Sequence, residues 1–191
     1  FTAVKAADND FSVAASTPTS VTVYAAVTTS VVTASLDLTY GVAMTATAPV
    51  VAYGGYGVTY SATLPAGLAI NSSTGVISGT PSAAGLPTNF SVTATDLNGS
   101  TSTSTIVISV LKAAPSIAWV TQPAATAAYG SVSVLAVATS NAGAVTYSSI
   151  TPATCDVQAA TGVFTLLRAG TCNYRATVAE SANFVTSTLT G

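Results

Sequence analysis

The chain has 191 residues, of which 49% are hydrophobic and only 5% are charged, and its formal net charge is −2. Its four basic residues are scattered, which excludes the basic clusters that nucleic-acid-binding proteins use to neutralise phosphates. No apolar run approaches the roughly 20 residues of a membrane-spanning helix, so we expect no insertion into a membrane.

The composition favours an all-β fold, because Thr, Val and Tyr are abundant and helix formers such as Glu, Lys, Gln and Met are nearly absent. Strand-like runs recur at short intervals between Gly, Pro, Asn and Ser residues. In the first part of the chain the predicted strands are 20–26, 30–36, 43–47, 57–62, 75–78, 89–96 and 102–111. In the second part they are 116–121, 132–139, 145–149, 154–158, 163–168, 172–179 and 184–189. This regular spacing predicts β-sandwiches.

A break in the pattern occurs at "LKAAPS", residues 111–116, where a long strand ends and a proline follows. We therefore expect one sandwich over residues 33–112 and a second over residues 113–191. Residues 1–32 are the trailing strand of an upstream module, a linker, or a strand that exchanges between subunits. The stretch "AADNDFSVAAST" (6–17) loosely repeats "AESANFVTSTLT" (179–190), which favours the first of these, and we expect the chain to be a piece of a longer protein.

The two cysteines, Cys155 and Cys172, each lie in a strand-like run, with a Gly-containing turn between them. This layout predicts a disulfide between two strands, and the alternative is a pair of buried free thiols. A zinc site is disfavoured, since there is no His and no CxxC motif. A disulfide implies an oxidising, extracellular or cell-surface location.

Calcium is the one cofactor for which the sequence offers candidate ligands, and we expect no other. Asp8, Asn9 and Asp10 lie near an expected module boundary, and Asp96 and Asn98 follow a predicted strand. Carboxylate and amide oxygens bind Ca²⁺. The alternative is ordinary turn chemistry, in which Asp and Asn side chains bond to nearby backbone.

Aromatic residues could form a sugar-binding surface. Tyr53, Tyr56 and Tyr60 are close in sequence, and the spacing of Tyr56 and Tyr60 predicts that both lie on one face of a strand. The alternative is that these side chains belong to the core or to a corner of the sandwich. We expect Trp119, early in the second sandwich, to have a packing role.

No catalytic residues are predicted. A Ser or Thr nucleophile needs a base, but there is no His, and Lys5 and Lys112 lie near expected module edges. The acids are dispersed, apart from Asp8 and Asp10, so a pair of glycosidase carboxylates would have to be assembled by the fold. The Gly-rich stretch at 64–85 matches no phosphate-binding motif. The sequence therefore does not indicate an enzyme.

The stretch "LPAGLAINSSTGVISGTPSAAG" followed by "VTATD" resembles the Ig domains of bacterial surface and adhesin proteins, over about residues 33–111. The matching positions are Leu64, Pro65, Gly67, Leu68, Thr74, Gly75, Ile77, Gly79, Thr80, Pro81, Gly85, Val92, Ala94, Thr95 and Asp96.

Residues from about 115 to 191 resemble a second bacterial Ig-like repeat. The matching positions are Val145, Tyr147, Ser148, Ser149, Pro152, Cys155, Val157, Val163, Leu166, Ala169, Gly170, Thr171, Cys172 and Ala176. Phe184 stands where that family usually has Tyr, and we expect this change to be neutral. The two resemblances together imply tandem immunoglobulin-like β-sandwiches.

These resemblances imply non-catalytic spacer modules of a secreted or cell-surface bacterial protein, of the kind found in adhesin stalks. Their partners would be neighbouring Ig-like modules of the same chain. One alternative is an adhesion module that binds a glycan or a protein. Another is a self-assembling subunit of an extracellular filament or layer, in which residues 1–32 exchange between copies to form a homopolymer.

Overall fold

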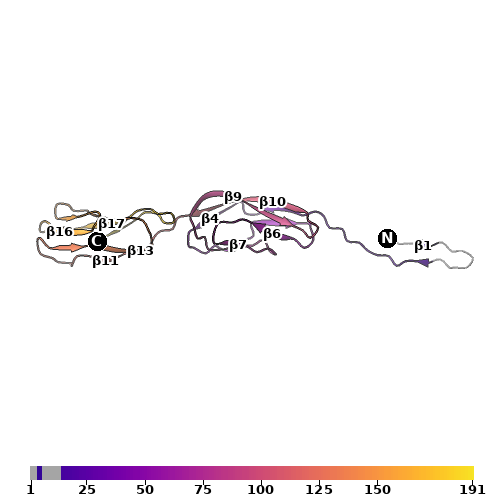
Figure 1. Ribbon diagram of the computed structural model, residues 1–191, viewed down its shortest axis with the longest axis horizontal. Helices are drawn as coiled ribbons and strands as arrows, with labels where there is room; N and C mark the ends of the chain where they lie inside the picture. The colour runs from indigo at the N-terminus through magenta and orange to yellow at the C-terminus, as the bar shows by residue number, and fades with distance from the viewer. Residues whose placement is uncertain (1–3, 6–13) are drawn as a thin grey trace, which may run out of the picture.

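The computed structural model describes residues 4–5 and 14–191, and these residues form strands, turns and loops without a helix. Three parts follow one another along the long axis of the molecule (Figure 1). They are the hairpin β1–β2, a first module of residues 28–111 and a second module of residues 117–190. The described part of the chain accordingly holds no helix long and apolar enough to cross a membrane.

The N-terminal hairpin pairs β1 (Val4–Lys5) with β2 (Ala14–Ala15) in antiparallel fashion. The segment from residue 16 to residue 26 leads from it to the first module and is exposed throughout. The strand predicted over 20–26 is wrong. Its apolar side chains do not pack against a sheet, and Val23 is 87% exposed.

The first module is built of two sheets. One sheet has the order β4 (Ser35–Thr39), β10 (Thr101–Leu111), β9 (Gly85–Thr95) and β6 (Thr59–Ala62). In it, β4 runs parallel to β10, whereas β10–β9 and β9–β6 are antiparallel. The other side pairs β3 (Thr28–Val31) with β5 (Val50–Tyr53), and β7 (Leu68–Ile70) with β8 (Ile77–Gly79). An isolated bridge between Thr47 and Ile77 links the segment before β5 to β8.

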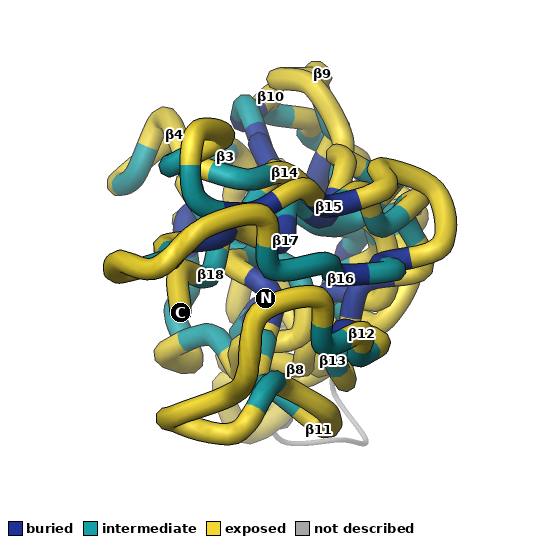
Figure 2. Tube along the Cα trace, turned by 90° about the vertical axis from the view of Figure 1, so that its left-hand side faces the viewer, coloured by how far each residue is buried: buried dark blue, intermediate teal, exposed yellow. Residues whose placement is uncertain are grey.

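The core of the first module follows from alternation along its strands, which breaks at the end of β10, where Ser109 is buried between Ile108 and Val110. In β10, Ile106 and Ile108 are buried, whereas Thr101, Thr103 and Thr105 point outward. From the opposite sheet, Val50 and Ile77 fill the same core. Figure 2, seen along the molecule, shows the buried positions inside and the exposed ones around them. The strands therefore place aliphatic side chains on their inner faces and hydroxylated side chains on their outer faces, which accounts for a composition rich in Thr and poor in charge.

The second module has eight strands in two layers, and two of them, β12 and β13, together occupy one strand position. In one layer, β11 (Ile117–Thr121) pairs with β13 (Ala136–Thr139), and β12 (Val132–Val134) pairs with β16 (Val163–Leu166), which pairs with β15 (Cys155–Val157). Only Leu135 separates β12 from β13. The other layer has the order β14 (Val145–Ser149), β17 (Tyr174–Val178) and β18 (Ser187–Thr190). This four-plus-three arrangement is that of a constant-type immunoglobulin sandwich.

The core of the second module is more aromatic than that of the first. Leu135, Cys155, Phe164 and Tyr174 are buried, and the ring of Tyr174 meets that of Phe164 edge to face at 5.4 Å. Trp119 packs on the other side of Tyr174 at 5.2 Å, and its Nε1 donates to the carbonyl of Thr190 at 3.3 Å. The packing role predicted for Trp119 agrees with these contacts.

Two strand predictions in the first module need correction, and two strands were not predicted. The strand predicted over 43–47 is reduced to the single Thr47–Ile77 bridge, and β5 and β7 were not predicted. The strand predicted over 30–36 is two strands, β3 and β4, which belong to different sheets. Because β3 pairs with β5, residues 28–31 pack with the first sandwich and not with the segment that precedes it.

Gly67, just before β7, and Gly79, at the end of β8, lie where the two strands of the β7–β8 pair approach each other closely. Gly67 and Gly79 have φ angles of 90° and 130°, which residues with a side chain rarely adopt. A Cβ on Gly79 would lie 2.2 Å from the carbonyl oxygen of Gly67, and that same oxygen accepts a bond from the amide of Thr80 at 3.0 Å. The two glycines thus allow the backbones of β7 and β8 to approach each other closely.

Candidate functional site

The candidate site is the junction between the first and the second module. The loop between β17 and β18, residues 179–186, reaches back to the end of the first module, and we call it the junction loop. Ala113 forms a parallel bridge with Phe184. The amide of Ala113 donates to the carbonyl of Asn183 at 2.9 Å, and the amide of Val185 donates to the carbonyl of Ala113 at 3.0 Å. The connecting segment is therefore held by backbone bonds to the second module.

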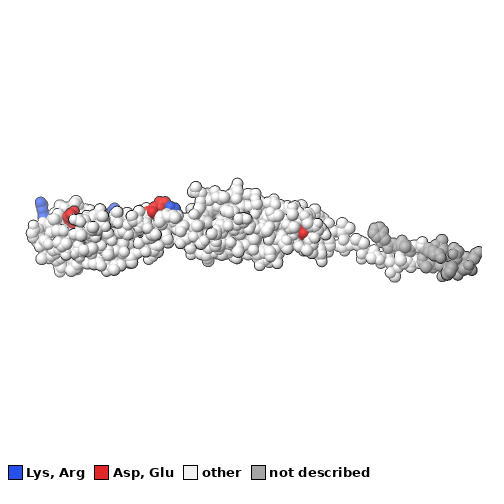
Figure 3. All heavy atoms as spheres, viewed as in Figure 1, with Lys and Arg blue, Asp and Glu red and all other residues white. Residues whose placement is uncertain are grey.

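Charge adds a second link at this junction. The Nζ of Lys112, directly after β10, pairs with the carboxylate of Glu180 and donates to the carbonyl of Ser181 at 2.7 Å. In Figure 3, red and blue atoms lie side by side between the modules on a surface that is otherwise nearly free of charge. An exposed pair of this kind contributes little stability, about 0–1 kcal/mol, but it fixes orientation. Lys112, considered above as a base, thus takes part in an ion pair.

Side chains of the junction loop also contact the body of the first module. The ring of Phe184 meets that of Tyr40, just after β4, edge to face at a centroid distance of 5.2 Å. The Oδ1 of Asn183 accepts a bond from the amide of Ala84, just before β9, at 2.9 Å. Such an aromatic pair is worth about 0.5–1.5 kcal/mol beyond its buried area. The junction therefore has an aromatic contact, an ion pair and backbone bonds, and together these oppose bending.

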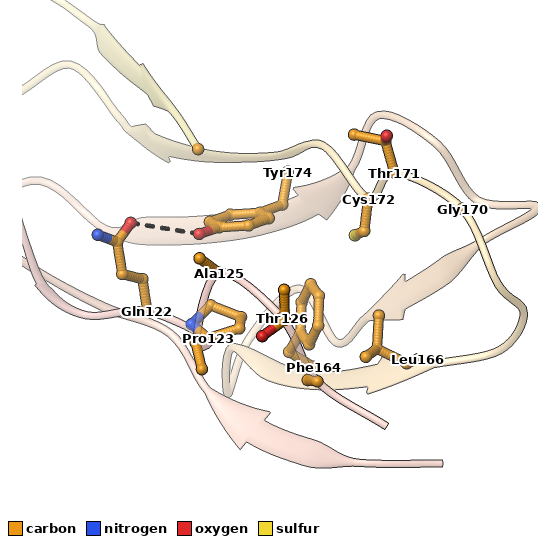
Figure 4. Close-up of a pocket in the computed structure, with 13 residues that line it drawn as sticks. Gln122, Pro123, Ala125, Thr126, Phe164, Leu166, Gly170, Thr171, Cys172 and Tyr174 are labelled. Carbon is orange, nitrogen blue, oxygen red and sulfur yellow. Dashed lines mark hydrogen bonds between the residues drawn. The ribbon is translucent and has the colours of Figure 1, made fainter. Parts of the chain in front are cut away.

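A cavity lies in the second module at the end of β11, β18 and the loop before β17. It has a volume of about 600 Å³ and is lined by Gln122–Ala127, Phe164, Leu166, Gly170–Cys172, Tyr174 and Gly191 (Figure 4). The hydroxyl of Tyr174 donates to Oε1 of Gln122 at 3.2 Å. Burial raises the pKa of Tyr174 above its ordinary value of 10.0, so the hydroxyl stays protonated at neutral pH. We call this cavity the end pocket.

The two cysteines form a disulfide that ties the two layers of the second module together. Cys155 begins β15 and is fully buried, and Cys172 lies two residues before β17, with a Cα–Cα distance of 5.7 Å. The hydroxyl of Thr154 donates to the carbonyl of Thr171 at 2.9 Å beside the bridge. Because Cys172 also lines the end pocket, the disulfide fixes one wall of that pocket.

Of the residues considered as calcium ligands, Asp8 and Asp10 lie outside the described residues. Asp96 is buried, and one carboxylate oxygen accepts the amides of Asn98 and Ser100, each at 2.9 Å. This is the turn chemistry that closes the connection between β9 and β10. Within the described part of the chain, no group of three His, Cys, Asp or Glu side chains could hold a metal ion.

The bonds of Asp96 lead to a prediction that separates turn chemistry from calcium binding. We expect Asp96→Ala to destabilise the first module by about 1–3 kcal/mol, because the amides of Asn98 and Ser100 lose the charged acceptor that the buried Asp96 provides. Asp96→Asn keeps an acceptor oxygen and should retain most of the stability. Thermal unfolding of the three proteins, with calcium and with EDTA, provides the measurement. A midpoint that rises with calcium in the wild type and not in Asp96→Asn would contradict this prediction.

Tyr56 and Tyr60, which were predicted to lie on one face of a strand, do not share a face, so that prediction is wrong. Tyr60 packs against the core, and its hydroxyl accepts a bond from the amide of Ala52 at 3.0 Å. Tyr56 lies in the turn before β6 and stacks on Tyr24 at 4.9 Å, and Tyr53 ends β5. Tyr24 and Tyr56 are each about half exposed, so this stacked pair forms an exposed aromatic surface on the first module.

The contacts of the junction loop were not identified from the sequence. Phe184 was noted as a neutral replacement for Tyr, and Tyr40 was not singled out. Phe184 was predicted to begin the strand 184–189, and the local sequence carries no signal for a contact with the first module. Its partner could not be found, because the two residues belong to different modules and are far apart in the sequence.

Comparisons with known proteins bear on the fold. A family model described as Putative Ig domain matches residues 2–111. No curated protein matches this chain.

Three solved structures illustrate the structural similarity. A mouse cadherin-23 fragment is 15% identical with a TM-score of 0.42, over 86% of this chain and 65% of that one. A four-domain fragment of protocadherin gamma B7 is 18% identical with a TM-score of 0.44, over 88% and 50%. An intimin fragment, in complex with the intimin-binding domain of its translocated receptor, is 20% identical with a TM-score of 0.30, over 70% and 50%. The chain therefore spans between half and two thirds of the length of these structures.

Proposed function

The chain belongs to the Putative Ig domain family, and from this premise we propose that it is a non-catalytic spacer in the stalk of a secreted or cell-surface bacterial adhesin. The modules correspond to residues 28–112 and 113–191, and the hairpin and linker precede them. The observation that carries the proposal is the junction, where Lys112, Asn183 and Phe184 hold one module against the next. A spacer works only if its joints resist bending, because a freely jointed chain collapses.

The strand pairing of the first module suits a chain under tension. β4, near its beginning, and β10, at its end, lie parallel and in register, from Ser35 beside Val107 to Thr39 beside Leu111. Hydroxyl bonds from Thr29 in β3 to Ser102 and Ser104 tie β3 to the same strand. Pulling the two ends apart loads these bonds together in shear instead of opening them one at a time. We infer that this arrangement raises the force at which the module unfolds.

Two further properties support a place outside the cell. A disulfide in a sandwich is typical of oxidising compartments, where thiols are not kept reduced. The described surface relies on Ser and Thr hydroxyls for its solubility, and Figure 3 shows how few charged side chains it carries. The stability of such a surface depends little on the salt concentration, because salt screens interactions between charges and few charges are present.

An adhesive module is a second candidate, and the exposed tyrosines favour it. Tyr24 and Tyr56 stack on each other, and each is about half exposed, as in surfaces that pack against a sugar ring. A glycan array probed with the whole chain separates the two functions. A spacer gives no signal, whereas a signal that Tyr56→Ala removes would establish the adhesive function instead.

The spacer proposal predicts that the junction becomes flexible when its aromatic contact is lost. We expect Phe184→Ala to widen the distribution of angles between the modules while each module keeps its melting midpoint. Small-angle X-ray scattering should then show a smaller radius of gyration. Tyr129→Ala, which removes a ring that is 80% exposed in the second module, is the matched control and should leave the scattering curve unchanged. Identical curves for Phe184→Ala and the wild type would count against the proposal.

A further inference from the structure

The first module contains three Asn-x-Ser sequences in which x is not proline. They are Asn71-Ser72-Ser73, Asn89-Phe90-Ser91 and Asn98-Gly99-Ser100. Transferases attach oligosaccharides to the asparagine of this sequence in exported proteins. Such sequences arise by chance in a chain rich in Ser and Thr, so the surroundings of each asparagine decide whether it can be an acceptor.

Two of the three asparagines are already engaged in the fold. Asn71 closes a turn, because its Oδ1 accepts the amides of Ser73 and Thr74 at 2.9 and 3.0 Å. Asn89 lies within β9, in the ladder that this strand forms with β10. There the chain is extended, so Asn89 and the hydroxyl-bearing Ser91 are about 7 Å apart along the strand. The fold therefore disfavours both asparagines as acceptors.

Asn98 lies in the exposed turn between β9 and β10. Within the described part of the chain, neither its carboxamide nor the hydroxyl of Ser100 forms a hydrogen bond. The backbone of the turn is fixed instead by Asp96, whose carboxylate accepts the amides of both residues at 2.9 Å. Gly99, between them, has a φ of 82°, which residues with a side chain rarely adopt. The turn therefore presents an asparagine and a hydroxyl that are both available to an enzyme.

The surface beside Asn98 is apolar and exposed. Leu97 is 70% exposed, and its amide donates to the carbonyl of Tyr56 at 2.9 Å. Tyr56 stacks on Tyr24, which precedes the first module, and the neighbouring Val23 is also exposed. Contiguous apolar patches on a protein surface usually mark an interaction site. An oligosaccharide on Asn98 would begin one residue from this patch, and sugar rings pack well against aromatic side chains.

We propose that Asn98 is an N-glycosylation site and that its oligosaccharide covers Leu97 and the adjacent pair of stacked tyrosines. The donor is an oligosaccharide linked to a polyprenyl diphosphate. The Nδ2 of Asn98 attacks C1 of the first sugar, so that a C1–N bond forms and the C1–O bond to the diphosphate breaks. The polyprenyl diphosphate leaves with the electron pair of that bond, and one Nδ2 proton passes to a base of the transferase.

The modification also suits a surface with few charges. An attached oligosaccharide is bulky and solubilising, and it adds polar groups where the side chains of the first module are apolar. The inference goes beyond the spacer function and shares with it only the proposed location outside the cell.

The chain isolated from the organism that makes it tests the site directly. Chymotrypsin has to be used, because the chain offers trypsin no site between Lys5 and Lys112. Mass spectrometry should find an oligosaccharide on the peptide with Asn98 in most molecules, and none on the peptides with Asn71 and Asn89. The intact glycopeptide is measured, since Asn-Gly sequences also deamidate spontaneously to aspartate. An unmodified Asn98 would overturn the inference.

A reconstituted transfer tests why Asn98 is selected. The folded recombinant chain is incubated with an oligosaccharyltransferase and a polyprenyl-diphosphate-linked oligosaccharide. Ser100→Ala should slow the modification by about a hundredfold or more, because an enzyme site built to bond a hydroxyl rejects an acceptor that lacks it. Ser100→Thr should retain the modification, and Ser91→Ala, the matched control in β9, should have no effect. Modification of Asn71 or Asn89 at the same rate as Asn98 would contradict selection by the fold.

Nitration of tyrosines by tetranitromethane tests whether the oligosaccharide covers the patch. Tyr24 and Tyr56 should react several times more slowly in the modified chain than in Asn98→Gln. Tyr129, exposed in the second module, should react equally in both proteins. Asn98→Gln should melt as the wild type does, because Asn98 offers Asp96 only its backbone amide. Equal nitration of Tyr24 and Tyr56 in the two proteins would overturn the covering role.

The failure of this site and the failure of the spacer function have different signatures. An unmodified Asn98 in a chain with a rigid junction would leave the spacer function intact. A flexible junction in a chain modified at Asn98 would contradict the spacer function alone.

Discussion

Reduction of the Cys155–Cys172 disulfide is expected to destabilise the second module by about 3 kcal/mol and to leave the first module unchanged. The bridge joins residues 17 positions apart, and closing a loop of that size restricts the unfolded chain by about this amount. For a module of this length, each kcal/mol shifts the melting midpoint by roughly 4–8 °C. Differential scanning calorimetry, with and without reductant, should therefore show one transition that moves and one that does not.

The double variant Cys155→Ala with Cys172→Ser provides the control for the reductant itself. It should melt as the reduced wild type does, and adding reductant should have no further effect. Equal shifts of both transitions would show that the disulfide does not act on the second module alone.

The second large effect is expected at Gly79, where Gly79→Ala should destabilise the first module by about 3 kcal/mol or more. Its φ of 130° costs a residue with a side chain about 1–3 kcal/mol. The added Cβ would also meet the carbonyl oxygen of Gly67 at 2.2 Å, so the β7–β8 pair must shift. Chemical denaturation should show a lower midpoint for the first module and an unchanged one for the second.

Gly85→Ala is the matched control, because Gly85 has no positive φ and no atom lies within 4 Å of the position that its Cβ would occupy. It should change the stability of the first module by less than about 0.5 kcal/mol, as surface substitutions usually do. If both alanine variants lost the same stability, the close approach of Gly67 and Gly79 would not explain the "STGVISGTP" stretch.

The sequence predicted those parts of the fold whose periodicity is local. Phe90, Val92 and Ala94 alternate with hydroxylated residues in β9, because a strand with one buried face needs that alternation. Strand β10 lies in a run of Ser, Thr, Ile and Val, which are residues that favour strands or leave their outer face hydroxylated. Strand β14 matches its prediction at both ends. Strand β5 was missed because its four residues run directly into Gly54 and Gly55, and β7 because three residues hold too little pattern.

Contacts between distant residues could not be predicted in the same way. Tyr56 was placed on a strand with Tyr60 by spacing alone, whereas the chain turns between them and Tyr56 meets Tyr24. The pairing of Phe184 with Tyr40 and of Lys112 with Glu180 depends on how two modules are placed, which no local pattern encodes. The cysteines could be predicted as a pair because they were the only two in the chain.

The rigidity of the inner junction can be measured most directly by residual dipolar couplings in a weakly aligned solution of the whole chain. Backbone couplings are fitted separately for residues 28–111 and 117–190. A spacer held by Lys112, Asn183 and Phe184 predicts one alignment tensor, with the same magnitude and orientation for both modules, and two different tensors in Phe184→Ala. Two tensors of different magnitude in the wild type would contradict the spacer function.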